Sequence, residues 1–220
     1  MATQAAELDT PSSILTAARA RLLVDGYAGL STRKIAQEAG VPLSQVHYHF
    51  GSKRGMVLAL LEAENRRRLT RQSAMYAQDA PLSRRYEQAC DFLEDDLESG
   101  FVRVLQEMIA AGWSEPEIAD AARNLLGGWY DLLNEVATEA ADVFGGLGPF
   151  SPLEVATLIG NLFIGSEAML LLGFDRHRFP IRSSLRRIGE VIRVAEQRAA
   201  IPIAKQTATK SASRTTKATS

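Results

Sequence analysis

The chain has 220 residues, of which 46% are hydrophobic and 23% charged, so a packed core is feasible and global disorder is excluded. Its single cysteine, Cys90, excludes an intramolecular disulfide and a thiolate metal cluster. Residues 1–72 carry a net charge of +4, residues 73–200 a net −9 and residues 201–220 a net +4. This asymmetry predicts that an anionic partner meets the N-terminal part of the chain.

The N-terminal third has the apolar spacing of short helices, and the alternating runs typical of strands are absent. Residues 1–10 are expected to be disordered. Gly26 should end the first helix, and Gly40 should supply the turn between the second and the third. These three helices are predicted at 12–25, 32–39 and 43–50.

The larger part of the chain, residues 53–200, also reads as helices throughout. A long helix opens at Lys53, and one or two more should fill 82–112 with a break at Ser99-Gly100. Two capping-box sequences, a serine followed three residues later by a glutamate, predict helix starts near 115 and 152. A last helix is predicted at 181–199. In all, about nine helices give an all-α fold.

We therefore predict two domains, 11–52 and 53–200, followed by a disordered basic tail at 201–220. The three short helices of the first domain suit a helix-turn-helix arrangement, which packs them on one small core and leaves one helix exposed. The predicted core consists of Leu22, Leu30, Ile35, Ala36, Ala39, Val41, Val46 and Phe50. The outward face of the 43–50 helix presents Ser44, Gln45, Tyr48 and His49, hydrogen-bonding side chains that suit base edges and phosphate oxygens.

The segment from Gly26 to Leu61 resembles the DNA-binding domain of the TetR family of bacterial transcriptional regulators. The resemblance is carried by Gly26-Tyr27, by the run Ser31-Thr32…Ile35-Ala36…Ala39-Gly40-Val41, by the aromatic-rich end His47-Tyr48-His49-Phe50 and by Ser52-Lys53. It implies a homodimer in which the small domains bind a palindromic operator, while the larger domains dimerise and house an effector pocket.

The resemblance also implies which residues meet double-stranded DNA. Those expected to face DNA at the start of the second helix are Thr32 and Arg33. Those expected to approach bases are Ser44, Gln45 and His47, and those expected to hold phosphates are Tyr48, His49 and Lys53. Leu43 stands where a polar residue is frequent in the family, and either touches a thymine methyl or packs.

A metal site formed by the pair His47 and His49 is the competing interpretation of this stretch. Side chains two residues apart on a helix point about 200° apart, so the two imidazoles cannot chelate one ion together. We therefore expect no metal here, and DNA contact or packing at the helix edge instead.

In the larger domain, core packing explains most large side chains, and some are also candidates for a ligand pocket. The candidate ligand-binding residues are Met108, Trp113, Trp129, Asn161, Phe163 and Glu167. Gly127-Gly128, two glycines inside an expected helix, suggest a kink or a close approach. The small residues Ala156, Gly160 and Gly165, with the 181–199 helix, suit a dimer interface.

Charged clusters elsewhere read as solvated faces. These are the arginines of 66–71, which could also attract DNA, and the acidic run 94–98, which lacks the spacing of a calcium loop. The apolar stretch 153–174 is interrupted by Glu154, Asn161, Ser166 and Glu167, so we expect no membrane span. Residues 1–13 have neither the basic region nor the apolar region of a secretory signal, so none is expected. With a single cysteine and no disulfide, a reducing cytoplasm is the expected location.

No phosphate loop, paired-carboxylate motif or nucleophile elbow appears in the sequence, so we expect neither an enzyme nor a cofactor. The leading hypothesis is a TetR-like repressor that binds an operator as a dimer and is released by a small, largely apolar effector. Two alternatives stay open at this point. One is an effector-independent DNA-binding protein, and the other is a helical ligand-binding protein whose helix-turn-helix is vestigial.

Overall fold

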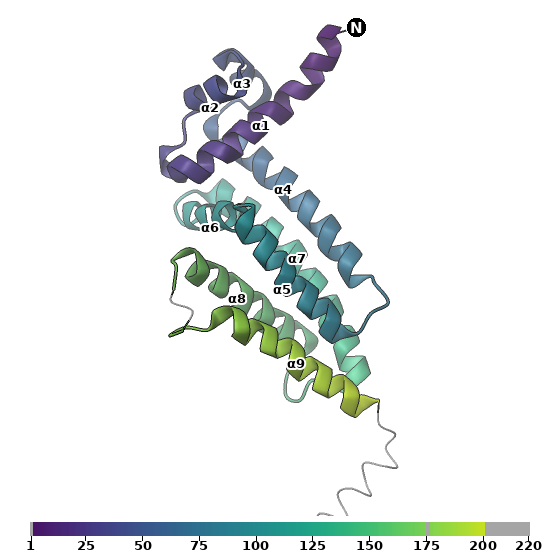
Figure 1. The fold of residues 1–220 in the computed structure, drawn as a ribbon. Helices are drawn as coiled ribbons and strands as arrows, with labels where there is room; N and C mark the ends of the chain where they lie inside the picture. The colour runs from purple at the N-terminus through teal and green to yellow at the C-terminus, as the bar shows by residue number, and fades with distance from the viewer. Residues whose placement is uncertain (1, 175–176, 201–220) are drawn as a thin grey trace, which may run out of the picture.

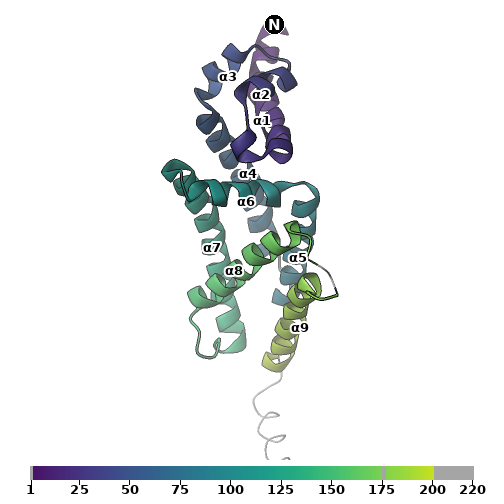
Figure 2. The same cartoon turned by 90° about the vertical axis from the view of Figure 1, so that its left-hand side faces the viewer.

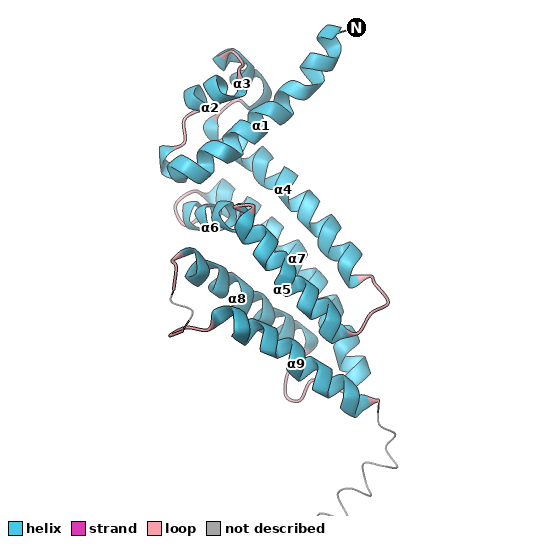
Figure 3. Ribbon diagram, in the orientation of Figure 1, coloured by secondary structure: helices cyan, strands magenta, loops and turns pink. Residues whose placement is uncertain are grey.

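The structure is a computed structural model that describes residues 2–174 and 177–200, with side chains from residue 10 onward. Within these ranges the chain forms nine α-helices and no strand, which confirms the predicted all-α fold (Figure 3). In chain order the helices are α1 (Ala2–Gly29), α2 (Thr32–Ala39), α3 (Leu43–Phe50), α4 (Lys53–Tyr76), α5 (Leu82–Glu98), α6 (Phe101–Gly112), α7 (Pro116–Phe144), α8 (Pro152–Leu171) and α9 (Ile181–Ala199). The tail predicted at 201–220 lies outside the described residues.

The helices form a small unit, α1–α3, at one end of the molecule and a larger unit built from α5–α9 (Figure 1). α4 leaves the small unit and runs along the larger one. α6 lies crosswise between the two units, beneath α1 and in contact with α7 (Figure 2). α4 and α6 are therefore the elements through which the two units meet.

One hydrophobic core spans both units, so the predicted division at residues 52 and 53 falls at the start of a helix that packs on both sides. Ile14, Leu22, Ile35 and Val46 of the small unit share a buried cluster with the first half of α4 and with α6 and α7. The predicted core of the small unit is confirmed, because every predicted member is either buried in this cluster or packs against it.

Two local predictions about helix ends are wrong. α1 begins at Ala2, so residues 2–10 are helical rather than disordered, in keeping with the good helix formers Ala, Gln, Glu and Leu in this stretch. The capping box predicted at Ser114 is absent: α7 has Glu115 at its N-cap, and the Ser114 hydroxyl donates to the Ala111 carbonyl at 3.2 Å. The serine stays with the preceding turn instead of opening the new helix.

Other predicted boundaries are confirmed. Gly26 adopts a non-helical φ of 67° and breaks the helical path of α1. Ser151 and Glu154 form the predicted capping box at the start of α8, in which the Glu154 amide donates to the serine hydroxyl and the Ser151 amide donates to the glutamate carboxylate.

The small residues of α8 face the interior of their own chain, contrary to the prediction that they form a dimer surface. Ala156 is buried against α7, and a Cβ at Gly160 would lie 2.2 Å from the Tyr130 ring. Gly165 alone faces open space. The prediction failed because spacing on one helix does not say which of two faces meets the rest of the chain.

Candidate functional site

The turn between α2 and α3 has the geometry that a helix-turn-helix requires. Gly40 adopts the left-handed conformation at φ 67°, and its amide and that of Val41 donate to the carbonyls of Gln37 and Ala36. This closes α2 without exposing its last carbonyls and lets α3 start at Leu43, only three residues later. The Gly40 conformation therefore sets the direction of α3.

α3 turns one face inward and presents the other to solvent. Val46 is buried in the core, while Ser44, His47 and Tyr48 are exposed and the Tyr48 side chain is 81% accessible. Gln45 and His49 are half-buried at the edges of this face. The exposed face carries hydrogen-bonding side chains with little charge, as direct contact with base edges requires.

The remaining residues predicted to meet DNA lie around this face. Arg33 is exposed on the first turn of α2, and Thr32 is half-buried beside it. Leu43 is half-buried and packs against the core of the small unit, which favours the packing interpretation of this residue. Lys53 starts α4, with its ammonium 4.4 Å from the centre of the Tyr27 ring.

His47 and His49 do not come together as metal ligands. His47 Nδ1 lies 3.0 Å from the Gly51 carbonyl, at the end of its own helix. The rings of Tyr48 and His49 meet edge to face, with centroids 4.9 Å apart. Within the described part of the chain, no group of three or more metal-ligating side chains is gathered at one place.

Tyr27 links the small unit to the larger one. Its hydroxyl donates to Glu115 at 2.8 Å, and its backbone amide donates to Glu107 at 3.0 Å. Burial, followed by the hydrogen bond to Glu115, raises the pKa of Tyr27 to about 12. Arg54, beside Lys53, pairs with Glu117 at 2.8 Å. The start of α4 is thus tied directly to the corner between α6 and α7.

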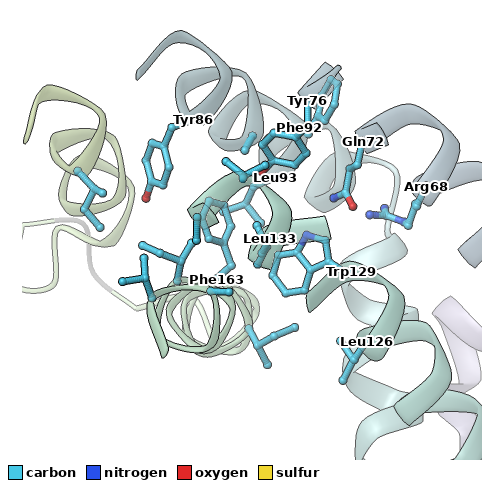
Figure 4. Close-up of a pocket in the computed structure, with 18 of the residues that line it drawn as sticks. Arg68, Gln72, Tyr76, Tyr86, Phe92, Leu93, Leu126, Trp129, Leu133 and Phe163 are labelled. Carbon is cyan, nitrogen blue, oxygen red and sulfur yellow. The ribbon is translucent and has the colours of Figure 1, made fainter. Parts of the chain in front are cut away.

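The larger unit encloses a cavity of about 330 Å³ between α4, α5, α6, α7, α8 and α9. Thirty residues line it, and all but seven of them are apolar, so a mostly apolar ligand fits it best. The seven polar lining residues are Asn65, Arg68, Gln72, Tyr76, Tyr86, Asp96 and Glu167. Figure 4 shows Arg68 and Gln72 on one side of the cavity, with Trp129 and Leu133 between them and Tyr86.

A buried ion-pair cluster closes the polar side of the cavity. Arg68 Nη1 pairs with Asp96 Oδ2, and Arg71 Nη2 lies 2.8 Å from Asp96 Oδ1. The Arg68 guanidinium also stacks 3.0 Å above the centre of the Phe101 ring. The arginine cluster and the acidic run were both predicted to be solvated faces, and for these residues that prediction is wrong. Neither stretch of sequence reveals its partner, because the partner lies on another helix.

Glu167 of α8 points toward the same cluster. Burial raises the pKa of its carboxyl to about 7, although Gln106, which donates to it at 3.3 Å, and the nearby Arg68 act in the opposite direction. The neutral and ionised forms are therefore both populated near neutral pH.

Three of the six predicted ligand-binding residues, Trp129, Phe163 and Glu167, line the cavity. The other three do not, so their predicted placement is wrong. Met108 is fully buried in the main core, and Trp113 is 84% exposed at the corner between α6 and α7. Asn161 lies on the exposed side of α8, where its side-chain oxygen accepts a hydrogen bond from Tyr130 at 2.7 Å.

Sequence reasoning missed the polar wall that α4 contributes to the cavity, made of Asn65, Arg68, Gln72 and Tyr76. Their spacings of three, four and four residues put them on one helical face, a pattern visible in the sequence. The signal was obscured because arginines at 66, 67 and 71 surround it.

The lone cysteine is not a reactive group in this arrangement. Cys90 is buried among Tyr86, Leu93 and their neighbours on α5. Burial raises the pKa of its thiol to about 11, so the nucleophilic thiolate is scarce at neutral pH.

Comparison with known proteins agrees with this geometry. Residues 14–60, which span α1 to the first turns of α4, match the family model of the bacterial regulatory proteins of the tetR family. No curated protein matches the sequence.

Three solved structures show the likeness over the whole fold. A TetR transcription regulator from Haloarcula marismortui has 20% sequence identity and a TM-score of 0.70, with 84% of this chain and 96% of that chain covered. FadR from Bacillus subtilis, in complex with stearoyl-CoA, has 16% identity and a TM-score of 0.67, with coverages of 82% and 96%. A protein from Saccharomonospora viridis in complex with choline has 21% identity and a TM-score of 0.70, with coverages of 83% and 96%.

At this level of identity the likeness to solved structures establishes the fold, and the match over residues 14–60 establishes the kind of domain that the fold carries. The exposed polar face of α3 lies within the matched segment, and the cavity lies outside it. Residues 14–60 thus match the N-terminal domain of the tetR family, and the chain has the fold of solved structures such as the regulator from Haloarcula marismortui.

Proposed function

We propose that this protein is a homodimeric repressor that binds a palindromic operator through α2 and α3 and releases it when a small, largely apolar molecule fills the cavity. The observation that carries the proposal is the course of α4. It starts with Lys53 at the DNA-facing surface and, three to six turns later, supplies the polar wall of the cavity. One helix therefore contacts both ligands.

The mechanism is a shift between two populations of the dimer. A dimer holds its two α3 helices at one separation, and a palindromic operator accepts only one separation in successive major grooves. A ligand that binds better to a cavity shape incompatible with that separation displaces the dimer from DNA. The contacts of Tyr27 and Arg54 with the corner between α6 and α7 provide a second mechanical link between the two units.

The second copy is proposed from an apolar surface on α8 and α9. α8 is long and apolar enough, by composition alone, to be a candidate membrane span, and only 22% of that window is buried. Leu158, Leu162 and Met169 form an exposed stripe along it, and Val191 and Val194 are exposed on α9. In Figure 2, α8 and α9 lie on the side of the larger unit that faces the viewer. Burying these side chains against the same surface of a second copy removes them from water.

The dimer is tested by light scattering on the full chain. We expect about twice the 24.0 kDa chain mass at micromolar concentration, and a monomer for Val191→Glu. Val24→Glu is the matched control, because Val24 is equally exposed but lies on α1. A monomeric wild type that still binds a palindrome tightly would refute the proposed dimer.

Operator binding is tested by selecting duplexes from a random pool and titrating the winners in a gel shift. Arg33→Ala, which removes an exposed DNA-facing guanidinium, should weaken binding while leaving the dimer intact. If selection yields no preferred sequence at physiological salt, the effector-independent, nonspecific alternative replaces this proposal. Wild-type affinity in Arg33→Ala would show that α2 is not positioned on DNA as proposed.

A further inference from the structure

Six of the seven polar lining residues lie on α4 or close to its Arg68, and Tyr86 lies on the other side of the cavity, which constrains the shape of any ligand. Asn65, Arg68, Gln72 and Tyr76 follow one face of α4, while the walls supplied by α7 and α9 are apolar. Figure 4 shows the Arg68 guanidinium and the Gln72 amide close together, with the ring of Trp129 between them and Phe163. A ligand that satisfies these walls has one polar end and an apolar body.

The fixed charges on that wall leave an excess of positive charge. Asp96 is the shared partner of two guanidinium groups, since Arg68 takes one of its oxygens and Arg71 takes the other at 2.8 Å. Asp95 approaches Arg71 only to 4.0 Å, and its side chain is 66% exposed, so solvent screens it. With Glu167 protonated, two positive groups therefore face one negative group, and Arg71 lies behind the lining of the cavity.

Hydrogen-bond donors on the same wall lack protein acceptors. Arg68 donates to Asp96 through Nη1 only. In the described part of the chain its Nε is buried without a partner. The side chains of Asn65 and Gln72 line the cavity and bond to no other described residue. Arg68 can only donate, whereas the amides of Asn65 and Gln72 can donate through nitrogen or accept through oxygen, so this end can satisfy an anionic acceptor.

Glu167 extends this set of donors when it is protonated. The charged groups facing it are Arg68 from α4 and Asp96 from α5, Gln106 of α6 donates to it, and α7 contributes apolar lining. Since burial raises its pKa to about 7, a large fraction carries a proton near neutral pH and can donate it to an acceptor.

We propose that the effector is an elongated apolar molecule with one terminal carboxylate, whose oxygens are held by Arg68 and by protonated Glu167. This assignment rests on the proposed function and names the chemical class of its effector. Guanidinium groups suit carboxylates because their fork of donors matches the two oxygens. A cationic end is disfavoured, because Arg68 and Arg71 already leave the wall positive and the Asp96 oxygens are occupied.

The volume limits the length of the molecule. The cavity of 330 Å³ is at the lower end of the range typical of small-molecule sites, roughly 300–1,000 Å³. At roughly 30 Å³ for each atom the size of a water molecule, it holds about eleven, close to the roughly twelve non-hydrogen atoms of a ten-carbon carboxylate. Decanoate, a straight-chain ten-carbon carboxylate, is therefore a suitable probe, with decanol and decylammonium as neutral and cationic analogues of the same length.

Binding is measured by the fluorescence of Trp129 in the otherwise unchanged full chain carrying Trp113→Phe, because these are the two tryptophans and Trp113 is exposed outside the cavity. We expect decanoate to bind at least about tenfold more tightly than decylammonium, given the 1.5–3 kcal/mol typical of charged hydrogen bonds. Equal or reversed preference would overturn the assignment.

Two substitutions locate the carboxylate. Arg68→Met should lower the affinity for decanoate at least about tenfold while leaving that for decanol nearly unchanged. The decanol reading shows that the cavity is intact, and Arg67→Met, at an exposed neighbour, is the matched control. Suppose that Arg68→Met lowers the affinities for decanoate, decanol and decylammonium alike, while its unfolding transition is the same as that of Arg67→Met. Arg68 then does not hold the carboxylate, and the assignment fails.

The role of Glu167 gives an independent readout. Decanoate should bind about tenfold more weakly at about pH 8 than at about pH 6, because the anion prefers the protonated carboxyl of Glu167. Glu167→Gln, which keeps a donor at all pH values, should flatten this dependence, whereas the exposed Glu135→Gln should preserve it. If the affinity of the wild type for decanoate does not change with pH, Glu167 does not contact the carboxylate.

Failure of this assignment is distinguishable from failure of the proposed function. Operator binding without ligand is measured separately in the gel shift. If the operator is bound but decylammonium, not decanoate, fills the cavity and releases DNA, the regulator proposal stands and the carboxylate class is wrong. If decanoate binds but never releases the operator, the ligand class stands and the repressor mechanism is wrong.

Discussion

The two units of this protein differ in where their polar side chains point. In α2 and α3 the polar groups, such as Arg33, Ser44 and Tyr48, face solvent, and the core beneath them is apolar. In the larger unit, Arg68, Asp96 and Glu167 point inward and need partners there. Because of this difference, substituting a polar residue in the small unit should change DNA binding, whereas substituting one in the larger unit should change the free energy of unfolding.

The largest expected effect is that of Asp96→Asn. It removes the carboxylate shared by Arg68 and Arg71, leaves the buried Arg68 guanidinium unpaired and leaves Arg71 with Asp95 alone, which should lower the free energy of unfolding by about 3–5 kcal/mol. Denaturant unfolding measures this decrease. Asp120→Asn breaks an exposed pair with Arg123 and should stay within about 0.5 kcal/mol of the wild type. If Asp96→Asn and Asp120→Asn lower the free energy of unfolding by similar amounts, the buried polar groups of the larger unit are not needed for its stability.

A glycine at the junction of the two units should be the next most sensitive position. A Cβ at Gly55 would lie 2.2 Å from the Phe50 carbonyl oxygen, so Gly55→Ala must displace the end of α3. We expect a decrease of about 1–3 kcal/mol in unfolding free energy, together with weaker operator binding. Gly127→Ala is the matched control. It meets nothing within 4 Å inside α7 and should stabilise the protein by about 1 kcal/mol.

Glu167 should make stability depend on pH in the direction opposite to an ordinary ion-paired carboxylate. Its pKa in the folded state, about 7, lies above the ordinary value of 4.5, so the unfolded chain releases this proton first as pH rises. Stability therefore falls between about pH 4.5 and pH 7, by at most roughly 3 kcal/mol. Glu167→Gln should raise the melting temperature relative to the wild type at pH 8 and not at pH 4.5. An equal change at both pH values would contradict this origin.

On the DNA-facing side, Gln45 and Lys53 should separate base reading from phosphate contact. Gln45→Ala should alter preference at one base pair of each half-site by about 1–3 kcal/mol. Lys53→Ala should weaken all operators alike and reduce the salt slope by about one unit for each phosphate that the lysine no longer neutralises. Single-base operator variants titrated at several salt concentrations measure both. Neither change should lower thermal stability by more than a surface substitution does, about 0.5 kcal/mol.

The smallest effect is expected at the link between the units. Tyr27→Phe removes the hydrogen bond to Glu115 but keeps the ring beneath Lys53, and should cost about 0.5–1.5 kcal/mol of stability. Its sharper readout is the coupling between decanoate and operator, which should weaken if this hydrogen bond transmits the signal. Unchanged coupling would show that this hydrogen bond does not transmit the signal, and would leave α4 and the remaining contacts of Tyr27 and Arg54 as the connections.

Much of the fold could be predicted because its signals are local. Apart from the start of α1, helix periodicity and the glycines at 26, 40 and 100 place the ends of the helices within a few residues. The DNA-facing residues lie in a continuous stretch of sequence, so one helical wheel assigns them to one surface. Whether they contact DNA as predicted is for the operator experiments to establish.

The cavity could be predicted only in part, because its walls come from six helices that span more than a hundred residues of sequence. Trp129, Phe163 and Glu167 were found through their size or through a polar group on an apolar helix. Met108 and Trp113 have the same kind of side chain, yet one is in the core and the other on the surface. The residue type alone does not say whether such a side chain lies in the core, in the cavity or on the surface, since its exposed fraction depends on which other helix covers it.

The sequence by itself determined the helical class, the order of the helices and the helix-turn-helix, because hydrogen bonds and apolar spacing within each helix are properties of consecutive residues. Only the tertiary structure decided that Arg68 and Arg71 share Asp96, that Gly160 accepts the Tyr130 ring, and that Glu167 is buried enough to hold a proton near pH 7. Each depends on a contact between distant segments, and such contacts arise from packing that no single helix specifies.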